Sequence, residues 1–217
     1  MICPSSIDKT PLTAPETFTN WARALTFTAT KAYLPSSRGE IVEIIRQAED
    51  TGQRVKWTGS IWSFMGNYIS KEVIIQSDAI TGEIDRALIL DRLTLSNPSL
   101  RDSLVHIKGG TKVFNVNRIL QGLPPVPVSQ EGDSTDEQNL ECTSYGRELA
   151  LPTLGGSGGQ SIAGVTATGS HGGDIFLPPI ADAVMAIHLI GPGGQEWWIE
   201  PSSGLTAGTE ADTQNQL

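Results

Sequence analysis

The sequence predicts an α+β domain, because segments typical of helices and of strands alternate along it at short spacings. Its 217 residues are 38% hydrophobic, which is enough for a packed core. No apolar run approaches the roughly 18 residues that a membrane helix needs. The N-terminus lacks a basic segment followed by an apolar stretch, so we expect no secretory signal and a cytoplasmic location.

Two segments are typical of short helices. The first begins after Pro35, has apolar residues at i, i+3, i+4 and i+7 from Ile41, and stops at Gly52. The second covers residues 112–121, where apolar residues lie three or four apart, and it ends at Gly122. Both patterns place one apolar face towards a core.

Strands are predicted where short runs are rich in β-branched and apolar residues. These runs are 54–57, 73–75, 104–107 and 184–190. The glycines and proline of residues 191–194 predict a turn, after which residues 195–200 return as the partner strand of a hairpin.

Two segments lack this periodicity. Residues 124–147 contain three prolines and an acidic polar stretch, and we interpret them as a surface insertion loop. Residues 202–217 are similarly polar. The predicted division is a lead segment at 1–30, a central domain at 31–201 that contains the insertion loop, and a polar tail at 202–217.

Composition argues against a nucleic-acid partner and a metal centre. The net charge is −9, with 24 acidic against 15 basic residues. Cys3 and Cys142 lie far apart, so no disulfide framework is expected, and a single bridge has no support. His106, His171 and His188 have no metal-ligand spacing. We interpret His106 and His188, each inside an apolar run, as core or edge residues.

The turn after strand 54–57 is the first candidate for ligand binding. Residues 58–63 read Thr-Gly-Ser-Ile-Trp-Ser, and a small-residue turn that leaves a strand exposes successive N–H groups, which can cradle a phosphate. A chain of net charge −9 would hold a phosphate through main-chain dipoles and hydroxyls. Taken alone, however, the segment favours an ordinary strand-to-loop turn.

The second candidate is the glycine-rich segment 154–173. Of the 23 glycines, 11 lie between Gly155 and Gly194. The segment has neither a G-x-G-x-x-G pattern, because Ser161 stands at its last position, nor the G-K-[ST] of a P-loop. Glycines at this density cost backbone entropy. Because apolar residues such as Ile162 and Val165 lie among them, we favour ligand-contacting backbone over a flexible linker.

Together these segments resemble the FAD-binding domain of vanillyl-alcohol-oxidase-type (PCMH-type) flavoproteins, most of all the aldonolactone and alditol oxidases. The resemblance spans residues 18–201 outside the insertion loop. It rests on residues 20–22, 58–64, 108–111, 151–173 and 187–194, with 160–164 and 168–172 as the most specific part. It implies a PCMH-type domain of two small α/β subdomains at 31–201, with its C-terminal part and the cap domain missing from this chain.

The resemblance also implies which residues bind FAD. The turn would wrap the pyrophosphate, and the glycine-rich segment would line the cofactor from the other side. The implied residues are Trp57, Thr58, Gly59, Ser60, Ile61, Trp62, Ser63, Gly155, Gly156, Ser161, Gly164, Val165, Thr166, Ala167, Thr168, Gly169 and His171.

Three of these positions have further implications. Trp62 stands where many relatives have the histidine that attaches the flavin, so noncovalent FAD is expected; Trp62 either packs or stacks near the cofactor. Gly155 aligns with a position near the flavin edge, where the lack of a side chain leaves a path for O₂ and favours an oxidase. His171 matches a family histidine, whose role is structural or catalytic.

The implied function is an FAD-dependent oxidase of hydroxyl groups in sugars, polyols or lactones, with hydride transfer to flavin N5 and then reduction of O₂ to H₂O₂. A flavin dehydrogenase acting on another alcohol, such as a sterol, and a non-catalytic FAD-binding module are the alternatives. The cap domain supplies the family's catalytic base, so Gly155, as the oxygen-access position, is the one reaction-related residue assigned. We expect a companion polypeptide that carries the cap.

Overall fold

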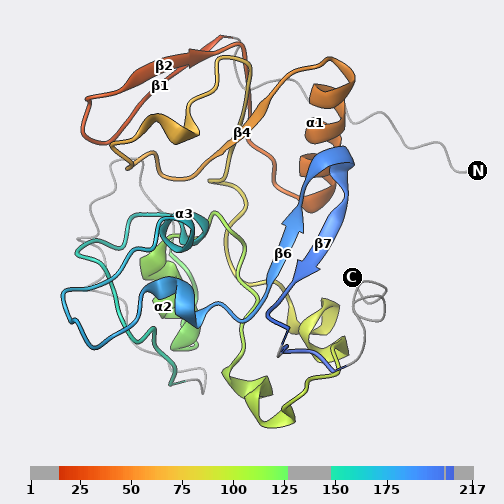
Figure 1. Cartoon of the computed structure of the whole chain (residues 1–217), viewed down its shortest axis with the longest axis vertical. Coiled ribbons are helices and arrows are strands. Elements are labelled where there is room, and N and C mark those ends of the chain that lie inside the picture. The colour runs from red at the N-terminus through yellow and green to blue at the C-terminus, as the bar shows by residue number, and fades with distance from the viewer. Residues whose placement is uncertain (1–14, 127–147, 203, 208–217) are drawn as a thin grey trace, which may run out of the picture.

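The computed structural model describes residues 15–126, 148–202 and 204–207 (Figure 1). The predicted insertion loop and polar tail fall largely outside these residues, as do both cysteines. The described part contains α-helices, short 3₁₀-helices and three small sheets, so the α+β prediction is confirmed. No helix among the described residues has the length and hydropathy required to span a membrane.

The central sheet consists of three parallel strands. They are β3 (Lys31–Tyr33), β4 (Val55–Thr58) and β5 (Val73–Gln76), in the order β3-β5-β4. The middle strand β5 buries Val73, Ile74 and Ile75 almost completely. An apolar run without alternation is typical of a strand that is covered on both faces. The predicted strands at 54–57 and 73–75 are thus confirmed.

Helix α1 (Arg38–Asp50) covers one face of this sheet. It begins at the N-cap Ser37, whose Oγ accepts from the Glu40 N–H (3.3 Å), and the Glu40 carboxylate accepts from the N–H of the preceding Ser36 (2.7 Å). Its Ile41 and Ile44 side chains pack in one cluster with Val73 and Ile75 of β5. The helix predicted after Pro35 is therefore confirmed.

A hairpin of β1 (Glu16–Thr19) and β2 (Thr26–Ala29) covers the other face. The rings of Phe18 and Phe27 stack with centroids 5.2 Å apart and pack in one cluster with Ile74 of β5. The described part of the predicted lead segment 1–30 therefore contributes to the core.

Strands β6 (Ile187–Ile190) and β7 (Glu196–Ile199) form the predicted hairpin. Its turn lies against α1, where the Gly193 N–H donates to the Glu49 carboxylate (2.8 and 2.9 Å) and Arg46 Nε donates to the Gly193 carbonyl (3.1 Å). Figure 1 shows the hairpin extending towards α1. β6 is shorter than the predicted strand 184–190, because its ladder with β7 begins only at Ile187, opposite Ile199.

The strand predicted at 104–107 is wrong. These residues follow a 3₁₀-helix at Pro98–Ser103, and their one ladder contact is an isolated bridge between Glu83 and Ile107. An apolar run becomes a strand where a neighbouring strand can pair with it along its length. Here the described residues supply no such neighbour.

Part of the predicted polar tail packs into the fold. Leu205 is 5% exposed and lies in a cluster with Leu93 and Leu95. Its carbonyl accepts a hydrogen bond from the Ser96 N–H (2.9 Å). One apolar residue in a polar stretch gives no periodicity, so the sequence analysis had no signal for this contact.

Helices α2 (Val113–Leu120) and α3 (Ile162–Ala167) lie below the central sheet in Figure 1. Val113 of α2 and Val165 of α3 share a buried cluster with Ile180. α2 confirms the helix predicted at 112–121 and places its first turn against the glycine-rich segment.

Candidate functional site

The candidate site lies at the carboxyl edge of the parallel sheet. The chain leaves β4 after Thr58 and β5 after Gln76, and the two exits are joined because the Ser77 N–H donates to the Thr58 carbonyl (3.0 Å). In open α/β sheets, ligands bind outside the carboxyl ends of the strands. The turn at residues 59–63 therefore begins where a ligand is expected.

This turn has a strained backbone. Ile61 has φ = +54°, a region that β-branched residues rarely adopt. Neighbouring residues hold the conformation, because the Trp21 N–H donates to the Ile61 carbonyl (2.9 Å) and the buried Asn20 Nδ2 donates to the Ser63 carbonyl (3.1 Å). Backbone strain of this kind is concentrated at functional sites.

The same turn presents N–H groups that have no acceptor among the described residues. Within the described ranges, none of the main-chain N–H groups of Ser60, Ile61, Trp62 and Ser63 donates a hydrogen bond to another residue. Successive N–H groups around a residue of positive φ form concavities that bind anions. The turn is chemically suited to a phosphate group.

The glycine-rich segment packs directly on this turn. Ser60 Oγ donates to the Gly159 carbonyl at 2.7 Å. A Cβ added at Gly159 would lie 2.7 Å from the Trp62 ring. A Cβ added at Gly59 would lie 2.1 Å from Ser161 Oγ. Glycine at the two positions leaves the space that the Ser161 side chain and the Trp62 ring occupy.

The start of α2 joins the same junction. An isolated antiparallel bridge pairs Lys112 with Ser161. Main-chain hydrogen bonds continue this pairing on both sides. They run from Val113 N–H to the Gln160 carbonyl (3.0 Å), Phe114 N–H to the Gly158 carbonyl (3.1 Å), Ile162 N–H to the Thr111 carbonyl (2.8 Å) and Ala163 N–H to the Gly109 carbonyl (3.1 Å).

Lys112 is a site residue that the sequence analysis missed. Its side chain is 8% exposed, and its Nζ lies 2.8 Å from Ser60 Oγ and 2.8 Å from Asp78 Oδ1 at the exit of β5. A signal was present in the sequence. A lysine directly before a helix is unfavourable, because the helix dipole disfavours a cation at that end and the preferred cap residues are Ser, Thr, Asp and Asn.

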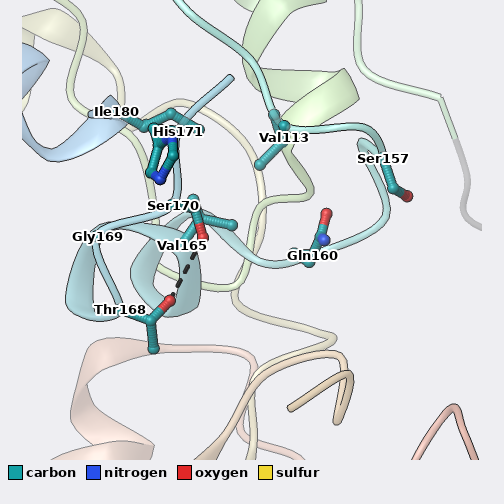
Figure 2. Close-up of a pocket in the computed structure, with 10 residues that line it drawn as sticks. Val113, Ser157, Gln160, Val165, Thr168, Gly169, Ser170, His171 and Ile180 are labelled. Carbon is teal, nitrogen blue, oxygen red and sulfur yellow. Dashed lines mark hydrogen bonds between the residues drawn. The ribbon is translucent and has the colours of Figure 1, made fainter. Parts of the chain in front are cut away.

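A cavity of about 330 Å³ lies beside this junction (Figure 2). Residues of α2, α3, the glycine-rich segment and a 3₁₀-helix line it. They are Val113, Gly155, Ser157, Gln160, Val165, Thr168, Gly169, Ser170, His171 and Ile180. Its volume is at the lower end of the range that small-molecule sites occupy.

The lining of the cavity contains a residue with an unsatisfied acceptor and, at Gly155, a glycine that borders open space next to Gly156. Gln160 Oε1 is buried, and no described residue donates a hydrogen bond to it. An atom in this state requires a donor from water or from a ligand. A Cβ added at Gly155 or Gly156 would meet nothing within 4 Å. His171 is exposed, and its Nδ1 lies 2.7 Å from the Gly172 carbonyl oxygen.

His106 and His188 lie together but do not line the cavity. Their ring centroids are 6.0 Å apart, and His188 Nε2 lies 2.8 Å from Glu196 Oε2. Burial, and then the nearby His188, lower the pKa of His106 to about 4. Among the described residues, no three His, Cys, Asp or Glu side chains are grouped so that they could hold a metal ion.

Sequence comparison finds relatives among lactone and alditol oxidoreductases. L-Gulono-1,4-lactone dehydrogenase of Mycobacterium tuberculosis is 27% identical over 82% of this chain and 33% of that protein. D-Arabinono-1,4-lactone oxidase of Candida glabrata is 23% identical over 86% and 29%. Alditol oxidase of a Streptomyces species is 22% identical over 84% and 35%. The chain thus spans about a third of these relatives, and no family model matches it.

Structure comparison finds the same architecture in solved flavoprotein folds. A mutant of cholesterol oxidase from Brevibacterium sterolicum superposes with a TM-score of 0.57 at 14% identity, over 86% of this chain and 32% of that one. Alkyldihydroxyacetonephosphate synthase gives 0.53 at 12% identity, over 86% and 28%. The fold is that of a PCMH-type FAD-binding domain. The resemblance stated from the sequence and the expected fold class are both confirmed.

Of the residues predicted to bind the cofactor, some meet at the junction, some line the cavity, and the others do neither. Residues 59–63 and Ser161 meet at the junction. Gly155, Val165, Thr168, Gly169 and His171 line the cavity.

The remaining predicted residues belong to neither set. The side chain of Trp57 packs in the cluster under α1, and Thr58 is buried in β4. Gly156, Gly164, Thr166 and Ala167 do not line the cavity, and the Thr166 hydroxyl donates back to the Ile162 carbonyl within α3.

Proposed function

We propose that this chain binds FAD without a covalent bond and supplies most of the FAD site of an oxidase that acts on hydroxyl groups of lactones, sugars or polyols. The observation that supports this most strongly is the turn 60–63, with four unused N–H groups at the carboxyl edge of a PCMH-type sheet. The substrate class follows from the names of the relatives, which are oxidoreductases of lactones and alditols.

The residues present fit this cofactor at two points. The N–H groups of 60–63 suit the two phosphates, for which a protein of net charge −9 has few cations to spare. Gln160 lines the cavity, and its buried, unsatisfied Oε1 suits an N–H donor, which both ring systems of FAD carry. Residues 157–160 adjoin both features, because Ser157 and Gln160 line the cavity and the Gly159 carbonyl accepts a hydrogen bond from Ser60 of the turn. An elongated dinucleotide therefore suits turn and cavity better than a small anion.

The chemistry that FAD supplies in such oxidases is acceptance of a hydride from the carbon that bears the hydroxyl, followed by transfer of the electrons to O₂. This chain's own residues bind and orient the cofactor in the proposal. Gly155 leaves open space beside the cavity, which suits an oxygen path.

Noncovalent binding is supported by the surroundings of Trp62. Its indole ring stacks on Trp21 with centroids 5.4 Å apart and lies against Gly159. An indole at this position offers no imidazole nitrogen for attachment of a flavin. Of the two roles left open for Trp62, packing is supported, because the ring fills the space between Trp21 and the glycine-rich segment.

A flavin dehydrogenase is the second candidate. It is favoured by one observation, that the relative at 27% identity is named a dehydrogenase. Release of hydrogen peroxide by the complete enzyme during turnover of a lactone or an alditol would support the oxidase. Reduction of a dye without peroxide would support the dehydrogenase.

We also propose that a companion polypeptide covers the β6–β7 hairpin and carries the substrate-binding cap domain. On this hairpin Ile187, Leu189 and Ile199 are 51%, 43% and 47% exposed. Apolar side chains grouped on an exposed sheet are typical of a face that another element covers. The relatives, about two and a half to three times as long, have the additional residues that such a cover requires.

The direct test is a titration of the purified 217-residue chain with FAD, followed by flavin fluorescence. We expect saturable binding, a yellow protein, and release of the flavin into the supernatant on acid precipitation. Colour that stays with the precipitate would overturn noncovalent binding. Absence of saturable binding would overturn the proposed function.

A further inference from the structure

Lys112 is placed where a lysine is costly. Its side chain is 8% exposed, and the residue precedes the first turn of α2 without capping it. Burial of an ammonium group is unfavourable unless hydrogen bonds and an opposite charge compensate it. The positive end of the helix dipole adds to the cost. Stabilisation of α2 therefore does not explain this residue.

The contacts of Lys112 are directed at the proposed phosphate turn. Its Nζ lies 2.8 Å from Ser60 Oγ, and Ser60 Oγ in turn donates to the Gly159 carbonyl at 2.7 Å. The second partner, Asp78 at 2.8 Å, follows β5 and is half exposed. The lysine therefore connects the turn after β4, the exit of β5 and the glycine-rich segment.

Because Ile61 is strained, the contacts of Lys112 help to hold the turn in its conformation. A β-branched residue with φ = +54° returns to an ordinary conformation unless its surroundings hold it. Lys112 and Asn20 contact the turn from its two ends, at Ser60 and at Ser63. If the contact at Ser60 were lost, the N–H groups of 60–63 would no longer be fixed in one arrangement.

We propose that Lys112 is a positioning residue for a diphosphate ligand: it fixes Ser60, and with it the N–H groups of the turn, and it places a positive charge next to the anion. The proposal rests on the proposed function, because the diphosphate is taken to be that of FAD. The chemistry recognised is a nucleoside diphosphate group, which ADP shares with FAD and riboflavin lacks.

The test compares variants of the 217-residue chain in binding to three probes: FAD, ADP and riboflavin. Lys112→Met should weaken FAD and ADP binding by at least tenfold, the effect of one lost charge-assisted contact. Riboflavin binding should change less than twofold. Lys112→Arg should restore part of the affinity, since it keeps the charge. Lys56→Met, an exposed lysine of β4, is the matched control and should bind all three probes as the wild type does.

Ser60→Ala also removes the contact between Lys112 Nζ and Ser60 Oγ. Asp78 still pairs with the lysine in this variant. Ser60→Ala therefore provides the test if Lys112→Met does not fold. It should weaken FAD and ADP at least fivefold and leave riboflavin unchanged. Unchanged FAD affinity in the folded variants, or an equal loss for riboflavin, would overturn the positioning role. A wild-type chain that binds neither FAD nor ADP would instead overturn the proposed function.

Discussion

Two neighbouring parts of the glycine-rich segment use glycine for opposite physical reasons. At the junction, Gly159 packs so closely on Trp62 that a Cβ would lie 2.7 Å from the ring. At the rim, defined as Gly155 and Gly156, a Cβ would meet nothing within 4 Å. The junction needs glycine to make room for the Trp62 ring, whereas the rim leaves space that no described residue fills.

The difference shows what each part contributes. The junction fixes a strained turn and its four N–H groups, which requires contacts from neighbouring residues such as Asn20, Trp21 and Lys112. The rim lies beside the cavity and contributes no packing that a larger residue would disturb. In the proposed function, rigid binding of the cofactor and access to it thus belong to adjacent residues of one segment.

The largest expected effect separates the two parts by stability. Gly159→Ala should lower the free energy of unfolding by about 1–3 kcal/mol, because the added methyl group overlaps the Trp62 ring. Gly156→Ala, the matched control at the rim, should change it by less than about 0.5 kcal/mol. Urea denaturation of both variants measures the difference. Equal effects would contradict the distinction between junction and rim.

The second prediction concerns the pH dependence of stability caused by His106, which lies in neither the junction nor the rim. Burial lowers the pKa of His106 to about 4, below its ordinary value of 6.5. The unfolded chain therefore binds a proton first as the pH falls, and the stability held above pH 6.5 is lost between pH 6.5 and 4. Because the ring is partly exposed, we expect a loss of about 1 kcal/mol rather than the full value.

Urea denaturation at pH 7 and pH 4.5 measures this loss. His106→Leu should remove this part of the pH dependence and leave FAD affinity at pH 7 unchanged. A variant that keeps the full pH dependence would show that other groups cause it.

The smallest effect on stability is expected at Gly155. Gly155→Val should change the free energy of unfolding by less than about 0.5 kcal/mol, because its Cβ enters open space. If this space admits O₂, the variant of the complete enzyme should release hydrogen peroxide at least tenfold more slowly while dye reduction is kept. Equal losses with O₂ and with the dye would contradict the proposed oxygen path.

Sequence reasoning predicted the elements whose signals are local. The pattern from Ile41 gave α1, and the apolar run at 73–75 gave the central strand. It failed at 104–107, where an apolar run has no strand beside it, and at Leu205, one apolar residue that reaches the core. Pairing and packing between distant segments decide both cases, and a local pattern does not contain them.

In the candidate site, too, the individual segments could be predicted from the sequence, but the contacts between them could not. Composition and resemblance pointed to the turn and to the glycine-rich segment. Their direct contact joins Ser60 to Gly159, which are 99 residues apart, so the sequence gives no local sign of it. Lys112 differs in part: a lysine directly before a helix is a local signal, but its partners Ser60 and Asp78 lie far from it along the chain, so the contacts themselves have no local sign.

The central claim is that the N–H groups of residues 60–63 bind the phosphates of FAD. The most direct measurement is the amide NMR spectrum of the ¹⁵N-labelled chain during a titration with FAD. The account predicts that the amides of Ser60, Ile61, Trp62 and Ser63 undergo the largest shift changes and that ADP reproduces them. Saturable FAD binding that leaves these four amides unchanged would contradict it.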